Sequence, residues 1–229
     1  MRECEVRDLG RAVYGPVWDM QKRLADDRKA GRIPDQLLFV EHPHVVTMGR
    51  NGREDNLLAP PDLLARAGIA YYEIDRGGDV TYHGPGQVVA YPIFDLREWK
   101  RDVGAYVRGL EQVIIEVLAE FGIAAGREKG APGVWVDGAK ICAIGVHLSR
   151  WVSSHGLAFN LATDLSYFRY IIPCGLTKPV TSLRQLGVEA TREQILARMV
   201  EHFGQIFEMR MSWPPPLTPA EPEPLETSA

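Results

Sequence analysis

The stretch GVWVDGAKICAIGVHLSRWVSSHGLAFNLA, residues 133–162, decides the fold class of the chain. It contains three apolar runs, at 133–138, 139–148 and 154–162, which are rich in β-branched residues and bounded by turn signals. The Asp137-Gly138 step between the first two runs favours a two-residue hairpin turn. We therefore expect three strands here, of which the first two pair as an antiparallel hairpin.

The residues before this stretch show the same pattern. Turn signals at 77–78 and 84–86 separate short runs of β-branched and aromatic residues. Two further apolar runs flank the His42-Pro43-His44 tripeptide. Extended segments are therefore expected at 37–49, 69–75, 80–83 and 87–96.

Three helices are expected around these strands. Apolar residues recur at three- and four-residue steps over 103–121, and Asp102 stands where a helix N-cap belongs. Thr191 and Gln194 form a capping-box pattern before a final helix, and a first helix is expected over 16–29. Hairpins without regular βαβ units indicate an α/β (α+β) domain with a mixed, largely antiparallel sheet flanked by helices.

The composition is that of an ordinary globular protein. The chain has 229 residues, of which 45% are hydrophobic and 24% charged, and its formal net charge is -4. This balance argues against a dedicated nucleic-acid-binding protein, because such proteins carry a basic excess. We expect one domain over 1–212 and a proline- and glutamate-rich, disordered tail over 213–229.

The cysteine pattern and the lack of long apolar runs bear on the compartment. Cys4, Cys142 and Cys174 are widely spaced and form no CxxC pair, so neither a disulfide framework nor a metal site is expected. The N-terminus has no signal-peptide core, and no apolar run approaches the roughly 20 residues of a membrane span. We expect a cytoplasmic protein that does not enter a membrane, with a monomer as the simplest oligomeric state.

The segment RGGDVTYHGPGQ, residues 76–87, is the first candidate for chemistry. Glycines on both sides of a short strand let the backbone approach a ligand and direct N–H groups at it. Arg76 can hold an anion, and His83 can donate or accept a proton. Turn glycines alone indicate only a hairpin, but the polar residues crowded around them favour a binding site.

Cys174 is the second candidate, in the context IIPCGL. The flanking proline and glycine hold the backbone in a defined bend, which exposes a thiol on one side as a nucleophile requires. A lone cysteine is more commonly a small buried core residue. The local sequence leaves both interpretations open.

Lys140 is the third candidate, because it begins the apolar strand expected at 139–148. Strict alternation puts it on the same face as Cys142 and Ile144. A lysine there either extends its ammonium to water at the sheet edge, or is partly desolvated with a lowered pKa that makes it a usable acid or base.

Small residues alternate on the opposite faces of two neighbouring strands. Ala143 and Gly145 lie on one strand, and Gly156 and Ala158 lie on the other. If the strands pair, these residues can line a slot for a fatty chain, whose burial contributes about 0.8 kcal/mol per methylene. They can equally serve close packing against a helix.

Three segments of the chain resemble the lipoyl(octanoyl) transferase family. RGGDVTYHGPGQ resembles the glycine-rich substrate loop of that family, and GAKICAIGVHL resembles the segment with its catalytic lysine. HGLAFNLATDLSYFRYIIPCGL resembles the segment that ends at its acyl-accepting cysteine. The resemblance extends over 37–185.

The resemblance implies the catalytic domain of biotin and lipoate protein ligases, with Cys174 as the acyl carrier, Lys140 as its catalytic partner and no cofactor. The donor would be octanoyl-acyl carrier protein, which delivers the acyl group on its phosphopantetheine arm. The acceptors would be lipoyl domains of 2-oxoacid dehydrogenase complexes and the glycine-cleavage H protein. The residues in contact with the acyl group would be Arg76, Gly77, Gly78, Asp79, Val80, Thr81, Tyr82, His83, Ala143, Ile144, Gly145, Gly156, Leu157 and Ala158.

In the expected reaction, Cys174 thiolate attacks the donor thioester and Lys140 stabilises the thiolate or moves its proton. An ATP-dependent lipoate or biotin ligase is an alternative, as are a thioesterase and a non-catalytic module that binds carrier proteins. Because both protein partners would be acidic, we expect a basic rim that uses Arg127, Lys129, Arg150 or Arg169.

Overall fold

The computed structural model describes residues 1–172 and 178–213. Cys174 and almost all of the tail expected at 213–229 lie outside the described residues. The elements, with η for short 3-10 helices, are β1 (Arg2–Arg11), α1 (Tyr14–Lys29), β2 (Asp35–Glu41), β3 (Val45–Met48), η1 (Glu54–Asn56), α2 (Pro61–Arg66), β4 (Ala70–Glu73), β5 (Val80–His83), β6 (Gln87–Ile93), η2 (Leu96–Glu98), α3 (Val103–Glu120), β7 (Gly126–Glu128), β8 (Ala131–Val136), β9 (Ala139–Ser149), β10 (Val152–Asn160), η3 (Leu165–Tyr170), α4 (Arg192–Phe207) and β11 (Met209–Ser212).

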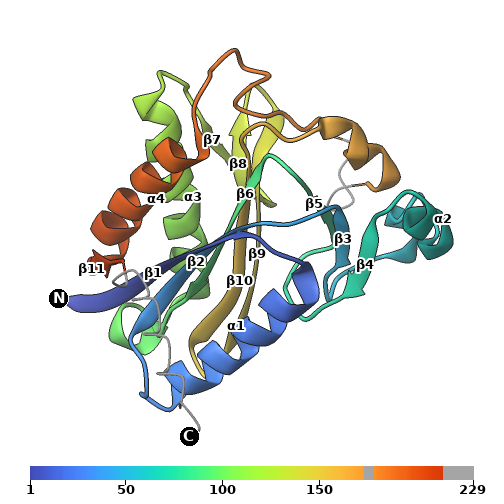
Figure 1. The fold of residues 1–229 in the computed structure, drawn as a ribbon. Helices are drawn as coiled ribbons and strands as arrows, with labels where there is room; N and C mark the ends of the chain where they lie inside the picture. The colour runs from blue at the N-terminus through green and yellow to red at the C-terminus, as the bar shows by residue number, and fades with distance from the viewer. Residues whose placement is uncertain (173–177, 214–229) are drawn as a thin grey trace, which may run out of the picture.

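A large sheet with the strand order β11-β1-β2-β6-β10-β9-β8-β7 forms the centre of the molecule (Figure 1). β1 is parallel to β11 and to β2, and the other neighbouring pairs in this sheet are antiparallel. A small sheet with the order β4-β3-β5 lies beside it. The expected mixed, largely antiparallel sheet is confirmed.

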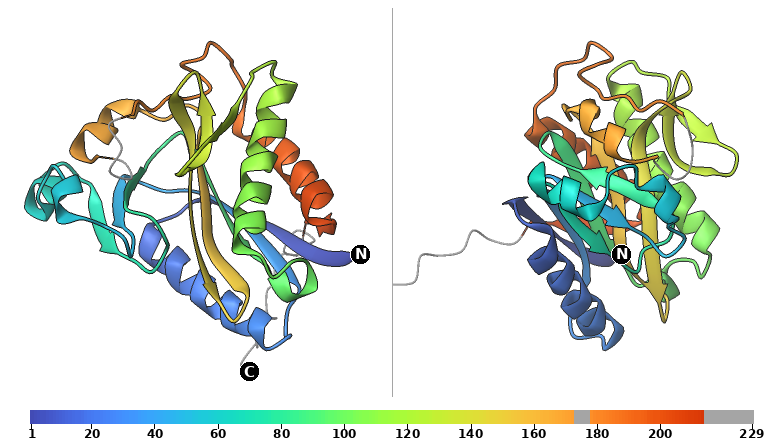
Figure 2. Two further views of the ribbon diagram at one scale, coloured as in Figure 1. Left: turned by 180° about the vertical axis from the view of Figure 1, so that it is seen from behind. Right: turned by 90° about the vertical axis from the view of Figure 1, so that its right-hand side faces the viewer.

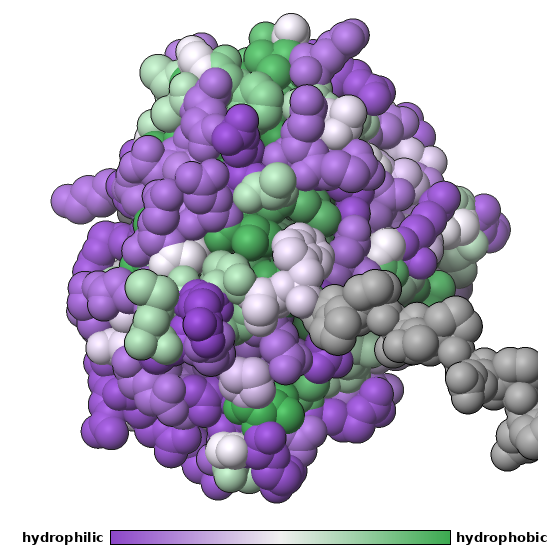
Figure 3. All heavy atoms as spheres, turned by 60° about the vertical axis from the view of Figure 1, so that its left-hand side comes forward, coloured by the Kyte–Doolittle hydropathy of each residue, from purple (hydrophilic) through white to green (hydrophobic). Residues whose placement is uncertain are grey.

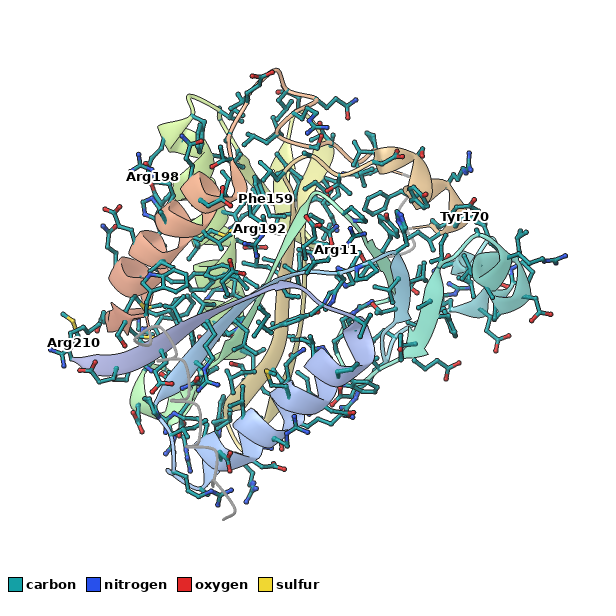
Figure 4. All side chains as sticks on the ribbon, viewed as in Figure 1. Arg11, Phe159, Tyr170, Arg192, Arg198 and Arg210 are labelled. Atoms are coloured by element: carbon teal, nitrogen blue, oxygen red, sulfur yellow. The ribbon has the colours of Figure 1, made fainter. Side chains whose placement is uncertain are left out.

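Helices cover the two faces of the large sheet unequally (Figures 1 and 2). α1 packs on one face, where Val17 and Leu24 meet Val89 and other apolar residues of β2, β6 and β10. α3 and α4 together cover the other face and bury the main core. Phe159, labelled in Figure 4, points into this core and is fully buried.

The outer surface is mainly polar. On the face shown in Figure 3, hydrophilic residues dominate and apolar patches between them are small. Burying the apolar stripes of the helices against the sheet is therefore the main stabilising term of the fold.

Local signals in the sequence set several boundaries correctly. Asp102 accepts a hydrogen bond from the Ala105 backbone N–H and caps α3, and Thr191 and Gln194 form the expected capping box of α4. Asp137 and Gly138 have φ values of 48° and 79°, which suit a hairpin turn. These elements depend on neighbours in sequence, so a local pattern suffices to predict them.

The two strands at the ends of the chain, β1 and β11, were not predicted from the sequence. β1 buries only Cys4 and Val6 among charged and polar residues, and β11 is short. Their pairing, Cys4 with Met211 for example, joins residues from opposite ends of the chain. Such an edge is set by tertiary packing rather than by local alternation.

Candidate active site

A pocket opens on the α1 side of the large sheet, between β6, β9, β10 and the small sheet. About 450 Å³ of space between atoms lies within it, the open solvent at its mouth included. Most of its lining was expected from the sequence: Arg76, Gly78, Thr81, His83, Ala143, Ile144, Gly145, Gly156, Leu157 and Ala158. The structure therefore brings segments far apart in sequence to one pocket, which we call the slot.

The expected substrate loop divides between the slot and the protein interior. Strand alternation turns Thr81 and His83 toward the slot, whereas Val80 and Tyr82 point into a separate apolar cluster beside α2 and η3. The Tyr82 hydroxyl lies 2.8 Å from His44 Nδ1. Val80 and Tyr82 thus anchor the loop in the apolar cluster and do not line the slot.

The glycine turn at 77–78 lies against the edge of β9. The Gly77 backbone N–H donates to Val146 O at 2.8 Å, and a Cβ on Gly145 would lie 2.9 Å from Gly77 O and 3.0 Å from Arg76 Cδ. Gly145 therefore makes room for the turn. A Cβ on Gly156 would lie 2.1 Å from Ala90 O, so Gly156 serves close packing of two strands, and Ala143 and Ala158 are the small side chains that leave space in the slot.

Arg76 and Asp79 hold this turn to the neighbouring loop. The Arg76 guanidinium donates to Thr47 O at 2.8 Å and to Thr47 Oγ1 at 3.0 Å. Asp79 accepts hydrogen bonds from the Arg53 backbone N–H and from Asn56 Nδ2. Asp79 thereby fixes the loop around η1, while Arg76 remains part of the slot wall.

His83 starts a chain of hydrogen bonds that leads to the lysine. Its Nδ1 donates to Gln87 Oε1 at 2.8 Å, Gln87 Nε2 donates to Asn160 Oδ1 at 3.0 Å, and Asn160 Nδ2 donates to Thr181 O at 3.0 Å. Burial lowers the pKa of His83 to about 3. The imidazole is therefore neutral at physiological pH, which favours a positioning role over the proton-donor role that the sequence left open.

Lys140 is held by its neighbours beside the slot. Its Nζ donates to Pro132 O at 3.2 Å and lies 4.7 Å from the centre of the Trp135 ring, and its residue is 6% exposed. The Lys140 backbone pairs with 179–181, because its N–H donates to Pro179 O and its C=O accepts from Thr181 N–H. The Lys140 side chain is thus buried against Pro132 and Trp135 and does not extend into water at the sheet edge.

The prediction that Lys140 lies on the same face of its strand as Cys142 is wrong. Between Val134 and Trp135 the pairing on β9 moves from Cys142 to Lys140, so Ile141 is an extra residue that forms a β-bulge. Ile141 and Cys142 both enter the main core. Strict alternation fails at the bulge, and Lys140 lines a small cavity together with Ala143, Ala158, Thr81 and Gln87.

An open groove continues from Lys140 toward solvent. It is bordered by Val103 and Val107 of α3, by 130–132, and by the glycine turn at 77–78. The groove shares Ile144 and Gly145 with the slot and Lys140 with the small cavity. Slot, cavity and groove therefore adjoin one another around Lys140.

The sequence missed a group of polar residues at the buried end of the slot. Tyr14, Tyr91 and His155 line it, and His42 lies 2.9 Å from the Tyr91 hydroxyl through its Nε2. These residues come from α1, β6, β10 and the β2–β3 connection, and none of them belongs to a recognisable local motif. No local signal marks them, because they meet only when the strands pair.

Among residues 1–172 and 178–213, no helix is long and apolar enough to cross a membrane. In the same part of the chain, no three His, Cys, Asp or Glu residues gather as metal ligands would. Cys142, fully buried in the main core, has its thiol pKa raised by burial. It therefore lacks the properties of a nucleophile.

Comparisons with known proteins agree with this architecture. The model of the lipoyl protein ligase A/B catalytic domain matches residues 14–204. An octanoyltransferase of Solibacter usitatus is 60% identical over 211 residues, 92% of this chain and 96% of that protein. One of Koribacter versatilis is 45% identical over 98% of this chain and 92% of that protein. A putative lipoate protein ligase from T. acidophilum with bound lipoic acid superposes with a TM-score of 0.72 at 15% identity, over 93% of this chain and 89% of that chain.

The sheet, the slot and the solved relative define a catalytic domain of the lipoate protein ligase type. The chain belongs to the lipoyl protein ligase A/B catalytic domain family, and its curated relatives place it among the octanoyltransferases of that family. It is accordingly an acyltransferase.

Proposed function

We propose that the chain transfers an octanoyl group from acyl carrier protein to a lysine of a lipoyl-domain protein, through a thioester on Cys174. The observation that carries this proposal is the slot, lined largely by small and apolar residues, which adjoins the small cavity of Lys140. Sinking the acyl methylenes into such a slot contributes about 0.8 kcal/mol each. The choice of octanoyl as the acyl group rests on the relatives, which are named octanoyltransferases.

The reaction has two acyl-transfer steps. Cys174 sulfur attacks the donor carbonyl, the bond from that carbonyl to the phosphopantetheine sulfur breaks, and the leaving sulfur takes a proton. The neutral acceptor amine then attacks the octanoyl-Cys174 thioester, an amide forms, and the Cys174 sulfur leaves. Lys140 stabilises thiolate as ammonium and accepts the amine proton when neutral, and such proton transfers typically contribute about 10²–10⁴-fold. The donor is already a thioester, so the proposed reaction requires no ATP or other cofactor.

The residues on either side of 173–177, the segment that includes Cys174, are anchored to η1 and to β7. Ile172 N–H donates to Asn56 O at 2.8 Å, and the Lys178 ammonium pairs with Glu128. Two residues further, Val180 forms a bridge with Lys140. Both anchors keep the ends of the segment near the loop around η1 and near Lys140, which supports a Cys174–Lys140 pair.

The groove is the proposed approach for both protein partners. Lys129 is exposed and directly precedes Gly130 at the groove edge, so it fits the expected basic rim. Arg127 instead pairs with Glu111 at 2.8 Å, and Arg169 lies beside the Tyr170 hydroxyl. Of these three residues, Lys129 is the best placed to attract an acidic carrier.

Intact mass of the protein after incubation with octanoyl-acyl carrier protein tests the proposal. Wild type should gain one octanoyl group, and an apo lipoyl domain should discharge it. Cys174→Ala should gain nothing, whereas Cys142→Ala, which removes a buried thiol, should gain the group as wild type does. Labelling that persists in Cys174→Ala would rule out the proposed thioester, and modification of the lipoyl domain only with ATP and free octanoate would favour a ligase.

A further inference from the structure

The slot has an open side and a closed side. Gly78 is exposed, and 143–145 are partly exposed. At the other side, Tyr14, Tyr91 and His155 are each 4% exposed or less. An acyl chain that enters beside Lys140 therefore runs toward these three buried polar residues.

The strand register gives the length of this path. Asn160 pairs with Gln87 next to the small cavity of Lys140, and Ala158 pairs with both Val89 and Ala143 one step further. Tyr91 lies four residues beyond Gln87 on β6, which is about 13 Å at 3.3 Å per residue. A carbon chain needs a further 3.5–4 Å or so to its nearest neighbour, which leaves about 9 Å.

This length matches eight carbons. Carbon–carbon bonds of about 1.52 Å at angles near 111° advance about 1.25 Å each, so seven bonds span about 9 Å. A chain with two more carbons would need about 2.5 Å more. It would have to displace the ring that closes the slot.

A hydrogen-bonded chain holds that ring in place. The carbonyl oxygen of Ala12 can only accept, so His42 Nδ1 donates to it at 2.7 Å. The other nitrogen, Nε2, then accepts from the Tyr91 hydroxyl at 2.9 Å. Both side chains are buried, and breaking the chain would leave polar groups unpaired.

We propose that Tyr91, held by His42, forms the end of the slot and determines the length of the acyl chain that the enzyme transfers. The ring acts as a fixed stop, because moving it breaks a buried hydrogen bond. The inference rests on the proposed acyl transfer and adds a specificity-determining residue to it.

Variants at two depths of the slot test this inference. The measurement is kcat/KM for transfer from hexanoyl-, octanoyl- and decanoyl-acyl carrier protein to an apo lipoyl domain. Tyr91→Ala should raise the decanoyl-to-octanoyl ratio about tenfold or more, the usual discrimination for a methylene-sized change of pocket. Tyr91→Phe keeps the ring but loses the hydrogen bond to His42, so its ratio should rise by less than that of Tyr91→Ala.

A change nearer to Lys140 should act in the opposite direction. Ala158→Val narrows the slot between Val89 and Ala143, so it should lower the octanoyl-to-hexanoyl ratio. If Tyr91→Ala shows no cooperative thermal unfolding and is therefore not folded, Tyr91→Leu is used in its place. An unchanged decanoyl-to-octanoyl ratio in a folded, active Tyr91 variant overturns the inference, as does an equal shift in Tyr91→Phe. A wild type that transfers no acyl group refutes the proposed function instead.

Discussion

Two groups of largely buried polar side chains lie at the two ends of helix α1, and they differ in charge. The ion cluster, around Arg28 in the last turn of α1, joins Arg2, Arg28, Asp35, Asp95 and Glu98. The slot cluster, around Tyr14 in the first turn, consists of Tyr14, His42, His83, Tyr91 and His155.

The ion cluster consists of opposite charges that pair with one another. Arg28 Nε lies 2.7 Å from Asp35 Oδ1, and Arg2 Nη1 lies 3.2 Å from Asp35 Oδ2. The Asp95 backbone N–H also donates to Asp35. These bonds tie β1, β2, α1 and the end of β6 together, so the cluster stabilises the fold.

The slot cluster is kept neutral and is less completely bonded. Burial lowers the pKa of His42 to about 4 and of His83 to about 3. His155 has a positive φ of 57° and donates from Nε2 to Asp75 at 2.8 Å. Its Nδ1 has no hydrogen-bond partner among the residues that the structure describes. Strain and an unpaired polar atom are tolerated where a site, rather than the fold, requires them.

The largest expected effect separates activity from stability at Lys140, beside the slot. Lys140→Met should lower the transfer rate about 10²–10⁴-fold and leave cooperative unfolding intact. Lys140→Arg keeps the charge but cannot release a proton, so it should fail in the amine step and retain part of the acylation step. Single-turnover acylation and discharge, followed separately, check this. A Lys140→Met enzyme with wild-type rates would remove Lys140 from the mechanism.

The next effect falls on stability alone. Arg28→Met leaves Asp35 buried without its main partner, which should lower the free energy of unfolding by about 3–5 kcal/mol. Arg32→Met removes a comparable pair, Arg32 with Asp27, at the surface. It should change the free energy of unfolding by about 0.5 kcal/mol or less. Urea unfolding of both variants measures the difference. Equal values would contradict the structural role of the ion cluster.

The smallest effect is a pH dependence of stability from the slot cluster. His42 and His83 have folded pKa values of about 4 and about 3, below the 6.5 or so of an unfolded histidine. Below pH 6.5 these histidines bind protons in the unfolded chain but stay neutral in the folded chain. The free energy of unfolding therefore falls as the pH falls from 6.5 toward 4. Each histidine contributes up to about 1.4 kcal/mol per pH unit.

Unfolding of wild type and His42→Asn between pH 6.5 and 4.5 measures this slope. The slope of the free energy of unfolding against pH should be smaller in the variant by the contribution of one histidine, because asparagine does not titrate. A slope that is identical in the two proteins would show that His42 takes up its proton in the folded state as readily as in the unfolded state.

Much of this protein can be predicted from its sequence. α1, α3, α4 and the Asp137-Gly138 hairpin were predicted correctly because each depends on neighbours in sequence. The glycine-rich segment, Lys140 and the small-residue strands are also site candidates from the sequence alone. The role of Cys174 remains a prediction that rests on sequence.

Only the tertiary structure decided how these parts meet. The bulge at Ile141 turned Lys140 toward Ala143, because the partner strand β8, not the alternation of β9, sets the register. The stop formed by Tyr91 and His42 joins residues 49 positions apart. The sequence determined the elements and the reactive residue types, since local propensity and residue chemistry are properties of the chain itself. The depth and polarity of the slot were left to strand pairing, since they depend on contacts between residues that are distant in the chain.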